Sequence, residues 1–259
     1  MTQCRLCLNT GKLVKAHVIP EAFFREIRVG DEIPHLISDT PNNFPKRSPI
    51  GIYDKEILCS QCEPKFAQVD NYGVQVLLKR LHELFLPITQ ANRIAAFEAK
   101  NINQDLLLRF LVATLWRASV STQGFYRRID LGTLEQLARQ TILNANSPVP
   151  KQFSAVLSRW TTDENNSFAT KGIMDPFPEK IDGVNSYRFY FGEVVAHIKA
   201  DTRPFPNSLR KLALLEQPTV MLVARELSKS KDFSAMIHTV KQSHQNYKKV
   251  HGIHPKILD

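Results

Sequence analysis

Two short stretches, Cys4-Arg5-Leu6-Cys7 and Cys59-Ser60-Gln61-Cys62, contain all four cysteines of this 259-residue sequence. A Cys-x-x-Cys pair presents two thiolates from one tight turn, and two such pairs supply the four sulfur ligands of a tetrahedral Zn²⁺ site. Two disulfides, or four unrelated buried thiols, are the alternatives. Disulfides need an oxidising compartment, and we expect no signal peptide before Cys4. The sequence therefore predicts a structural zinc site formed by Cys4, Cys7, Cys59 and Cys62.

The segment between the two pairs predicts a β-hairpin with a long insertion. Residues 12–19 alternate like a strand, and Pro20 ends it because proline has no amide to donate to a ladder. Residues 50–58 form the second expected strand. The turn-rich stretch 29–53 lies between the strands as a surface loop or a functional one. From Glu63 to Phe85, apolar residues recur every three or four positions, which indicates a helix.

This order of elements resembles the zinc-stapled branch of the HNH endonucleases. The resemblance is carried by the first Cys-x-x-Cys, by a strand that ends in His17-Val18-Ile19-Pro20, and by Leu58-Cys59-x-x-Cys62 at the start of a helix. It covers about residues 1–75. Members of this family share a β-hairpin and a following helix that bind one divalent metal ion. The resemblance therefore implies a ββα-metal unit at the N-terminal end of this chain.

The same resemblance implies roles for individual residues. His17 occupies the position of the general base. Asp54 stands where the family has asparagine, Glu63 stands where it has its last histidine, and Ala16 replaces the acidic residue or histidine that usually precedes the base. Asp54 and Glu63 both offer oxygen ligands, which suit a catalytic Mg²⁺ or Mn²⁺. The expected site thus reads His–Asp–Glu, with the four cysteines holding a separate structural Zn²⁺.

Three functions follow as alternatives. The resemblance implies a metal-dependent endonuclease acting on DNA or RNA, used as a toxic effector in anti-phage defence, in some cases beside a partner ATPase. The altered ligand positions leave open a catalytically inactive zinc module that docks on nucleic acid or on a partner protein. A third alternative makes the large remaining body the active part and the zinc unit an accessory.

Composition is consistent with a nucleic-acid ligand. The formal net charge is +9 and the isoelectric point about 9.4, with 43% hydrophobic and 23% charged residues. Residues 201–259 contain 10 Lys and Arg against 5 Asp and Glu, so they hold more than half of the excess. A basic balance favours anionic partners through phosphate attraction, although solubility alone also explains it. A basic tail over residues 241–256 is the expected contact region.

We predict an α+β fold in three parts. Residues 1–86 form the zinc-bound HNH-like domain, residues 87–182 a helical region, and residues 183–259 a mixed strand and helix region with the basic tail. Helices are expected at 103–122, 131–143 and 232–247, and strands at 187–199, with a bend at Gly192, and at 219–224. No apolar run is long enough to span a bilayer. We therefore expect a cytoplasmic protein, where zinc thiolates stay reduced.

Overall fold

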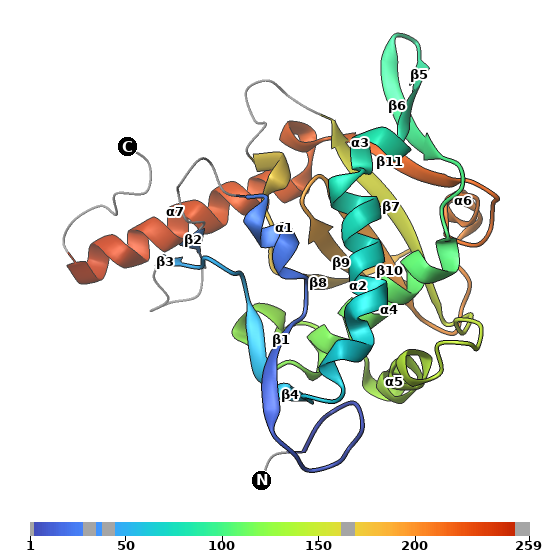
Figure 1. Cartoon of the computed structure of the whole chain (residues 1–259). Helices are drawn as coiled ribbons and strands as arrows, with labels where there is room; N and C mark the ends of the chain where they lie inside the picture. The colour runs from blue at the N-terminus through green and yellow to red at the C-terminus, as the bar shows by residue number, and fades with distance from the viewer. Residues whose placement is uncertain (1–2, 28–34, 38–44, 162–168, 252–259) are drawn as a thin grey trace.

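A seven-stranded sheet forms the centre of the fold (Figure 1). The computed structural model describes residues 3–27, 35–37, 45–161 and 169–251. Neighbouring strands are antiparallel except β11 and β7, which run parallel with Leu222 opposite Leu157. Across the sheet the strands follow the order β5 (Leu86–Gln90), β6 (Arg93–Ala99), β11 (Val220–Glu226), β7 (Phe153–Thr161), β10 (Val194–Ala200), β9 (Val184–Phe191) and β8 (Phe177–Ile181).

One face of this sheet is covered by the central helix α4 (Gln104–Val120). Asn103 caps the helix, because its side chain accepts a hydrogen bond from the Leu106 amide at 3.0 Å. Every residue from 107 to 118 is buried, as a helix apolar almost all round requires. The helix packs on β7 and β10, and α2 (Ala67–Val74) and α5 (Glu135–Leu143) pack on its other side. The expected helices at 103–122 and 131–143 are therefore confirmed.

The other face of the sheet receives the start of the long helix α7 (Lys231–His251). Here a smaller apolar cluster forms around Trp160, with Phe233 and Met236 of α7 packed against it. Asp232 is 3% exposed and accepts hydrogen bonds from Arg188 at 2.6 Å and from the Tyr190 hydroxyl at 2.9 Å. This buried ionic contact attaches the first turn of α7 to β9.

The N-terminal hairpin stands beside this body and matches the sequence prediction. Strands β1 (Leu13–His17) and β4 (Tyr53–Cys59) pair antiparallel, and the short helix α1 (Glu21–Arg25) follows β1. Within the long insertion, β2 (His35–Leu36) pairs with β3 (Lys46–Arg47), while residues 28–34 and 38–44 lie outside the described residues. One continuous core joins the hairpin, α4 and the sheet, and it includes the mutually packed rings of Phe23, Phe110 and Phe191.

The helix expected over residues 63–85 is helical but not regular. It begins as a 3₁₀ turn at Glu63–Phe66, continues as α2, widens into a π-helical turn at Gln75–Lys79, and restarts after Arg80 as α3 (Leu81–Leu84). Gly73 stays within α2 and is buried. A Cβ atom at this position would lie 2.4 Å from the Phe110 ring. Glycine is therefore required here for close packing of α2 on α4.

Replacing Gly73 by Ala should destabilise the protein by about 1–3 kcal/mol, because the added methyl group overpacks a fully buried ring. Denaturant unfolding measures this change in the free energy of unfolding. Gly124→Ala is the matched control, since a Cβ atom there meets no atom within 4 Å. Equal stability of the two variants would contradict the close packing of α2 on α4.

The remaining chain confirms the α+β class, but the region expected to be helical, residues 87–182, also contains strands. The strand pair bent at Gly192, the strand near residue 220 and the last helix are present as β9–β10, β11 and α7. The central region 87–182, however, is not simply helical, because it also contributes β6, β7, β8 and most of β5. The seven-stranded sheet therefore takes strands from both sides of the boundary expected at residue 182. Among the described residues, no helix combines the length and apolarity needed to cross a membrane.

Candidate metal centre and the adjacent hairpin face

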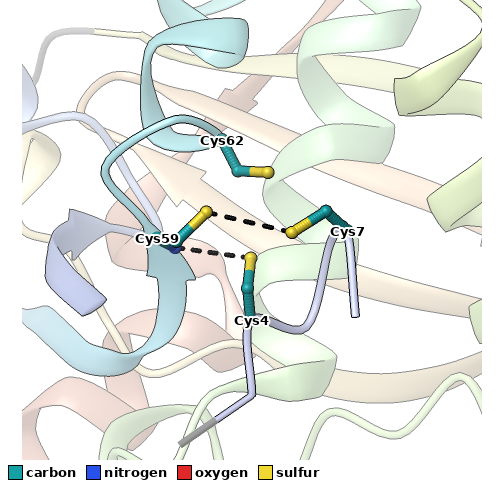
Figure 2. Close-up of side chains that lie close together, drawn as sticks. All are labelled: Cys4, Cys7, Cys59 and Cys62. Atoms are coloured by element: carbon teal, nitrogen blue, oxygen red, sulfur yellow. Dashed lines mark hydrogen bonds between the residues drawn. The ribbon is translucent and has the colours of Figure 1, made fainter. Parts of the chain in front are cut away.

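The four cysteines form one cluster at the base of the hairpin (Figure 2). Their sulfur atoms all lie within 4.8 Å of one another, and the Cys7 and Cys59 sulfurs are 3.9 Å apart. Zinc–sulfur bonds of about 2.3 Å in a tetrahedron place sulfur atoms about 3.8 Å apart, whereas a disulfide brings them to about 2.05 Å. All four are free thiols. The cluster is therefore compatible with a structural zinc ion, and the predicted disulfide alternative is not found.

Local backbone geometry builds this cluster. Leu8 adopts a left-handed conformation, with φ of 65°, and its amide donates to the Cys4 carbonyl at 2.9 Å, which closes the first turn. The Cys62 amide closes the second turn by donating to the Cys59 carbonyl at 3.0 Å. The Cys59 amide donates to the Cys4 sulfur at 3.3 Å and links the two turns (Figure 2).

The thiols of the cluster differ in acidity. Burial raises the pKa of Cys59, but hydrogen bonds from the backbone of Gln61 and from the Cys62 thiol outweigh it and lower the pKa to about 7. Burial and the hydrogen bonds with Cys59 and Cys7 raise the pKa of Cys62. Of these two thiols, Cys59 therefore forms its thiolate easily and Cys62 keeps its proton. A divalent ion bound by the cluster removes this difference in acidity, because its charge favours the thiolate form of all four cysteines at once.

His17 ends β1 with one ring nitrogen tied to the backbone. Its Nε2 lies 2.9 Å from the Ile50 carbonyl oxygen, so Nε2 donates and the neutral ring keeps a lone pair on Nδ1. Burial lowers the pKa of His17 below 6.5, although the Ile50 hydrogen bond and the Glu21 carboxylate act in the opposite direction. The half-buried imidazole is thus neutral near pH 7.

Asp54 does not join His17. The strand register places Asp54 opposite Ala16 and His17 opposite Tyr53, so the two side chains lie on opposite faces of the hairpin. The Asp54 carboxylate is 0% exposed and accepts hydrogen bonds from the Ser121 hydroxyl (2.8 Å), from the amide and hydroxyl of Thr122 (2.6 and 3.0 Å) and from the Glu56 amide (2.8 Å). Its oxygen atoms are therefore occupied by protein donors.

Two further acidic residues near the hairpin, Glu63 and Asp70, have different surroundings. Glu63 is exposed in the first helical turn after Cys62, and its carboxylate is close enough to His17 to act on the pKa of the imidazole. Asp70 forms an ion pair with Arg117. Arg117 donates to both carboxylate oxygens, at 2.6 and 2.7 Å, and its side chain is only 3% exposed. Among the described residues, only the four cysteines form a cluster of three or more potential metal ligands. The expected general base His17 and the expected oxygen ligands Asp54 and Glu63 are not brought together as such a cluster.

A group of side chains beside His17 was missed in the sequence. Lys15 and Lys55 are exposed, and their ammonium nitrogens lie 4.9 and 5.9 Å from the centre of the Tyr53 ring. The His17 ring meets the same Tyr53 ring edge-on, with centres 5.9 Å apart. We call Lys15, His17, Tyr53 and Lys55 the hairpin face. Strand alternation could have revealed it, because residues two apart share a face.

The basic tail is only partly described. Lys241, Lys248 and Lys249 are exposed on α7, and residues 252–256 lie outside the described part of the chain. Comparison with known proteins adds no assignment, because no family model, no curated protein and no solved structure matches this chain. The function of this chain is therefore inferred from the residues of the cysteine cluster and of the hairpin.

Proposed function

We propose that this protein is a zinc-stapled endonuclease that hydrolyses phosphodiester bonds of nucleic acid, with His17 as its general base. One observation carries the proposal. The hydrogen bond from His17 Nε2 to the Ile50 carbonyl holds the imidazole in the tautomer whose Nδ1 lone pair is available. A base that acts near pH 7 must be neutral there, and the lowered pKa of His17 provides this.

The chemical step needs few groups of this chain. Nδ1 of His17 takes a proton from water, the water oxygen attacks phosphorus, and the bond from phosphorus to the leaving oxygen breaks. A divalent cation, when bound, stabilises the charge on the phosphate and on the leaving oxygen. Glu63 is the residue that would hold it, since Mg²⁺ takes one or two protein carboxylates and otherwise water and phosphate. Asp54 does not fit this role, because its oxygens already accept four protein hydrogen bonds.

The occupied carboxylate of Asp54 favours a second function, that of a binding module. If the ligand set has been lost, the zinc unit is a binding module that docks on nucleic acid or on a partner protein, and His17 is a strand-end residue bonded to backbone. The role in anti-phage defence and the ATPase partner remain predictions from the family resemblance.

Replacing His17 by Ala should lower nucleic-acid cleavage by about 10²–10⁴-fold, the usual contribution of a general base, without changing zinc content or binding. Gel assays with labelled DNA and RNA, in the presence of Mg²⁺ or Mn²⁺ and with no added divalent ion as blank, measure the rate. His238→Ala is the control, because His238 is exposed on α7. In wild type, the rate should fall on the acid side as His17 becomes protonated, and burial of the imidazole should place this fall at lower pH than for an exposed histidine.

Two outcomes would reject the enzyme. Wild type and His17→Ala could cleave equally, which would mean that a contaminant or another site is responsible. Wild type could also bind nucleic acid yet cleave nothing with either metal. In that case the binding module replaces the nuclease as the function of the hairpin.

A further inference from the structure

The hairpin face combines two features that act on different parts of a nucleotide. Lys15 and Lys55 supply cationic groups for phosphate, and Tyr53 supplies an aromatic ring for a base. The lysines are exposed and the ring is half-buried, so solvent reaches all three side chains. Both ammonium groups lie over the Tyr53 ring, 4.9 and 5.9 Å from its centre, so a base that stacks on the ring displaces a lysine toward the neighbouring phosphate. This combination is the one by which proteins hold single strands.

The form of the strand follows from the position of the ring. A base reaches an aromatic side chain on a protein surface only when it is free of its own stack and pairing partner. The bases of an intact duplex are stacked inside the helix and do not meet the hairpin face. The face therefore favours single-stranded nucleic acid over duplex.

The backbone around the face supports its exposure. The register of β1 and β4 shifts between Val14 and Ala16, which indicates a bulge that leaves the residues around Lys55 and Glu56 outside regular pairing. The Glu56 amide turns inward there and donates to Asp54 at 2.8 Å. Bulges redirect side chains beside functional sites, and this one leaves Lys55 pointing to solvent near the Tyr53 ring.

We propose that the hairpin face binds a single nucleic-acid strand, with one base stacked on Tyr53 and the neighbouring phosphates against Lys15 and Lys55. This deepens the proposed function and rests on it, since it takes nucleic acid as the ligand of the hairpin. Because the His17 ring touches the Tyr53 ring, the phosphate next to the stacked base is the one delivered to the imidazole. Tyr53 is thus a positioning residue.

Fluorescence anisotropy without added Mg²⁺ or Mn²⁺ tests binding without cleavage while the structural Zn²⁺ stays in place. The probes are labelled oligo-dT and oligo-U of about 16 nucleotides, with a DNA duplex of equal length and poly-glutamate as comparisons. Wild type should bind both single strands more tightly than the duplex, and poly-glutamate weakly. Tyr53→Leu should weaken single-strand binding about 5- to 150-fold, whereas Tyr53→Phe, which keeps the ring, should retain it.

The lysines are tested through salt dependence. The double variant Lys15→Ala, Lys55→Ala should reduce the slope of log K against log salt by about 1.4, at about 0.7 for each lost phosphate contact. The control carries Lys180→Ala and Lys211→Ala, two exposed lysines at β8 and after α6, outside the hairpin. Thermal unfolding and zinc content verify that each variant is folded.

The outcomes separate this inference from the nuclease. Wild type that binds single strands through Tyr53 but never cleaves supports the hairpin face and rejects only the enzyme. Cleavage with unchanged affinity in Tyr53→Leu, or duplex binding as tight as single-strand binding, overturns the hairpin face and leaves the role of His17 standing. Equal binding of poly-glutamate would show a site for any polyanion and would also overturn it.

Discussion

Replacing Cys59 by Ser should remove zinc from the protein and leave it unstable or insoluble. Elemental analysis of wild type should find one Zn²⁺ per chain, because the four sulfurs form a single cluster. Structural zinc in small zinc-folded units contributes about 10–16 kcal/mol, which equals or exceeds the usual total stability of about 5–15 kcal/mol. Loss of one thiolate ligand should therefore unfold at least the hairpin and the loop before β1.

The control and the chelation experiment make this prediction specific. Ser60→Ala changes an exposed neighbour within the same turn and should leave zinc content and unfolding temperature unchanged. A strong chelator should lower the unfolding temperature of wild type, and added Zn²⁺ should restore it. A metal-free protein that unfolds at the wild-type temperature would contradict the zinc assignment.

The effect of zinc should extend beyond the hairpin because the cluster is part of the main core. Cys4, Cys59 and Cys62 belong to the same continuous cluster of buried residues as Phe110 and Leu222. Leu6, between the first two cysteines, is fully buried, and its carbonyl accepts a hydrogen bond from Arg139 of α5 at 2.6 Å. A hairpin released from zinc therefore exposes apolar surface of α4 and α5 as well.

The elements that could be predicted from the sequence are those with a local signal, such as a ligand spacing or one apolar face. The cysteine pairs, the amphipathic helices and the β9–β10 hairpin each have a local signal, and all were found. Strand β7 has none, because it is central and buried on both faces, and its apolar run lacks strict alternation. Strand β5 has no buried face, because it is exposed along its whole length.

The candidate site was predictable in its scaffold and less so in its ligands. Spacing alone identified the cysteine cluster. The role of Asp54 depends on Ser121 and Thr122, which lie at the end of α4 and are brought to it only by packing. The pairing of Asp70 with Arg117 links residues 47 positions apart in the same way. Such partners leave no periodic signal, so the structural roles of Asp54 and Asp70 could not be predicted from the sequence.

These contacts give the hairpin a fixed position on the body. Asp54 attaches β4 to the end of α4, while Arg117, stacked on the Phe66 ring at 4.6 Å, attaches α4 to α2. The two carboxylates thus hold β4 and α2 against α4. Because these contacts fix the elements that carry His17 and Glu63, few further residues are needed to keep the two side chains in place.

Replacing Asp54 by Ala should destabilise the protein by about 3–5 kcal/mol, because several buried donors lose a charged acceptor at about 1–3 kcal/mol each. Asp54→Asn, the residue of the HNH family, would be tolerated if Asp54 were only a metal ligand. The structure leads us to expect a cost of about 1–3 kcal/mol instead. The Asp54 oxygens face the backbone amides of Glu56 and Thr122, so the amide group of Asn opposes a donor in either orientation.

Thermal and denaturant unfolding of the two variants measure both costs, with about 2–4 °C of unfolding temperature for each kcal/mol in a chain of this size. Glu56→Ala is the matched control, since Glu56 is exposed on the same strand and uses only its backbone amide in this contact. Zinc content should stay at one ion per chain in the folded fraction of each variant. Wild-type stability in Asp54→Asn, combined with a raised requirement for Mg²⁺ in cleavage, would return Asp54 to the metal site and remove it from the structural link between β4 and α4.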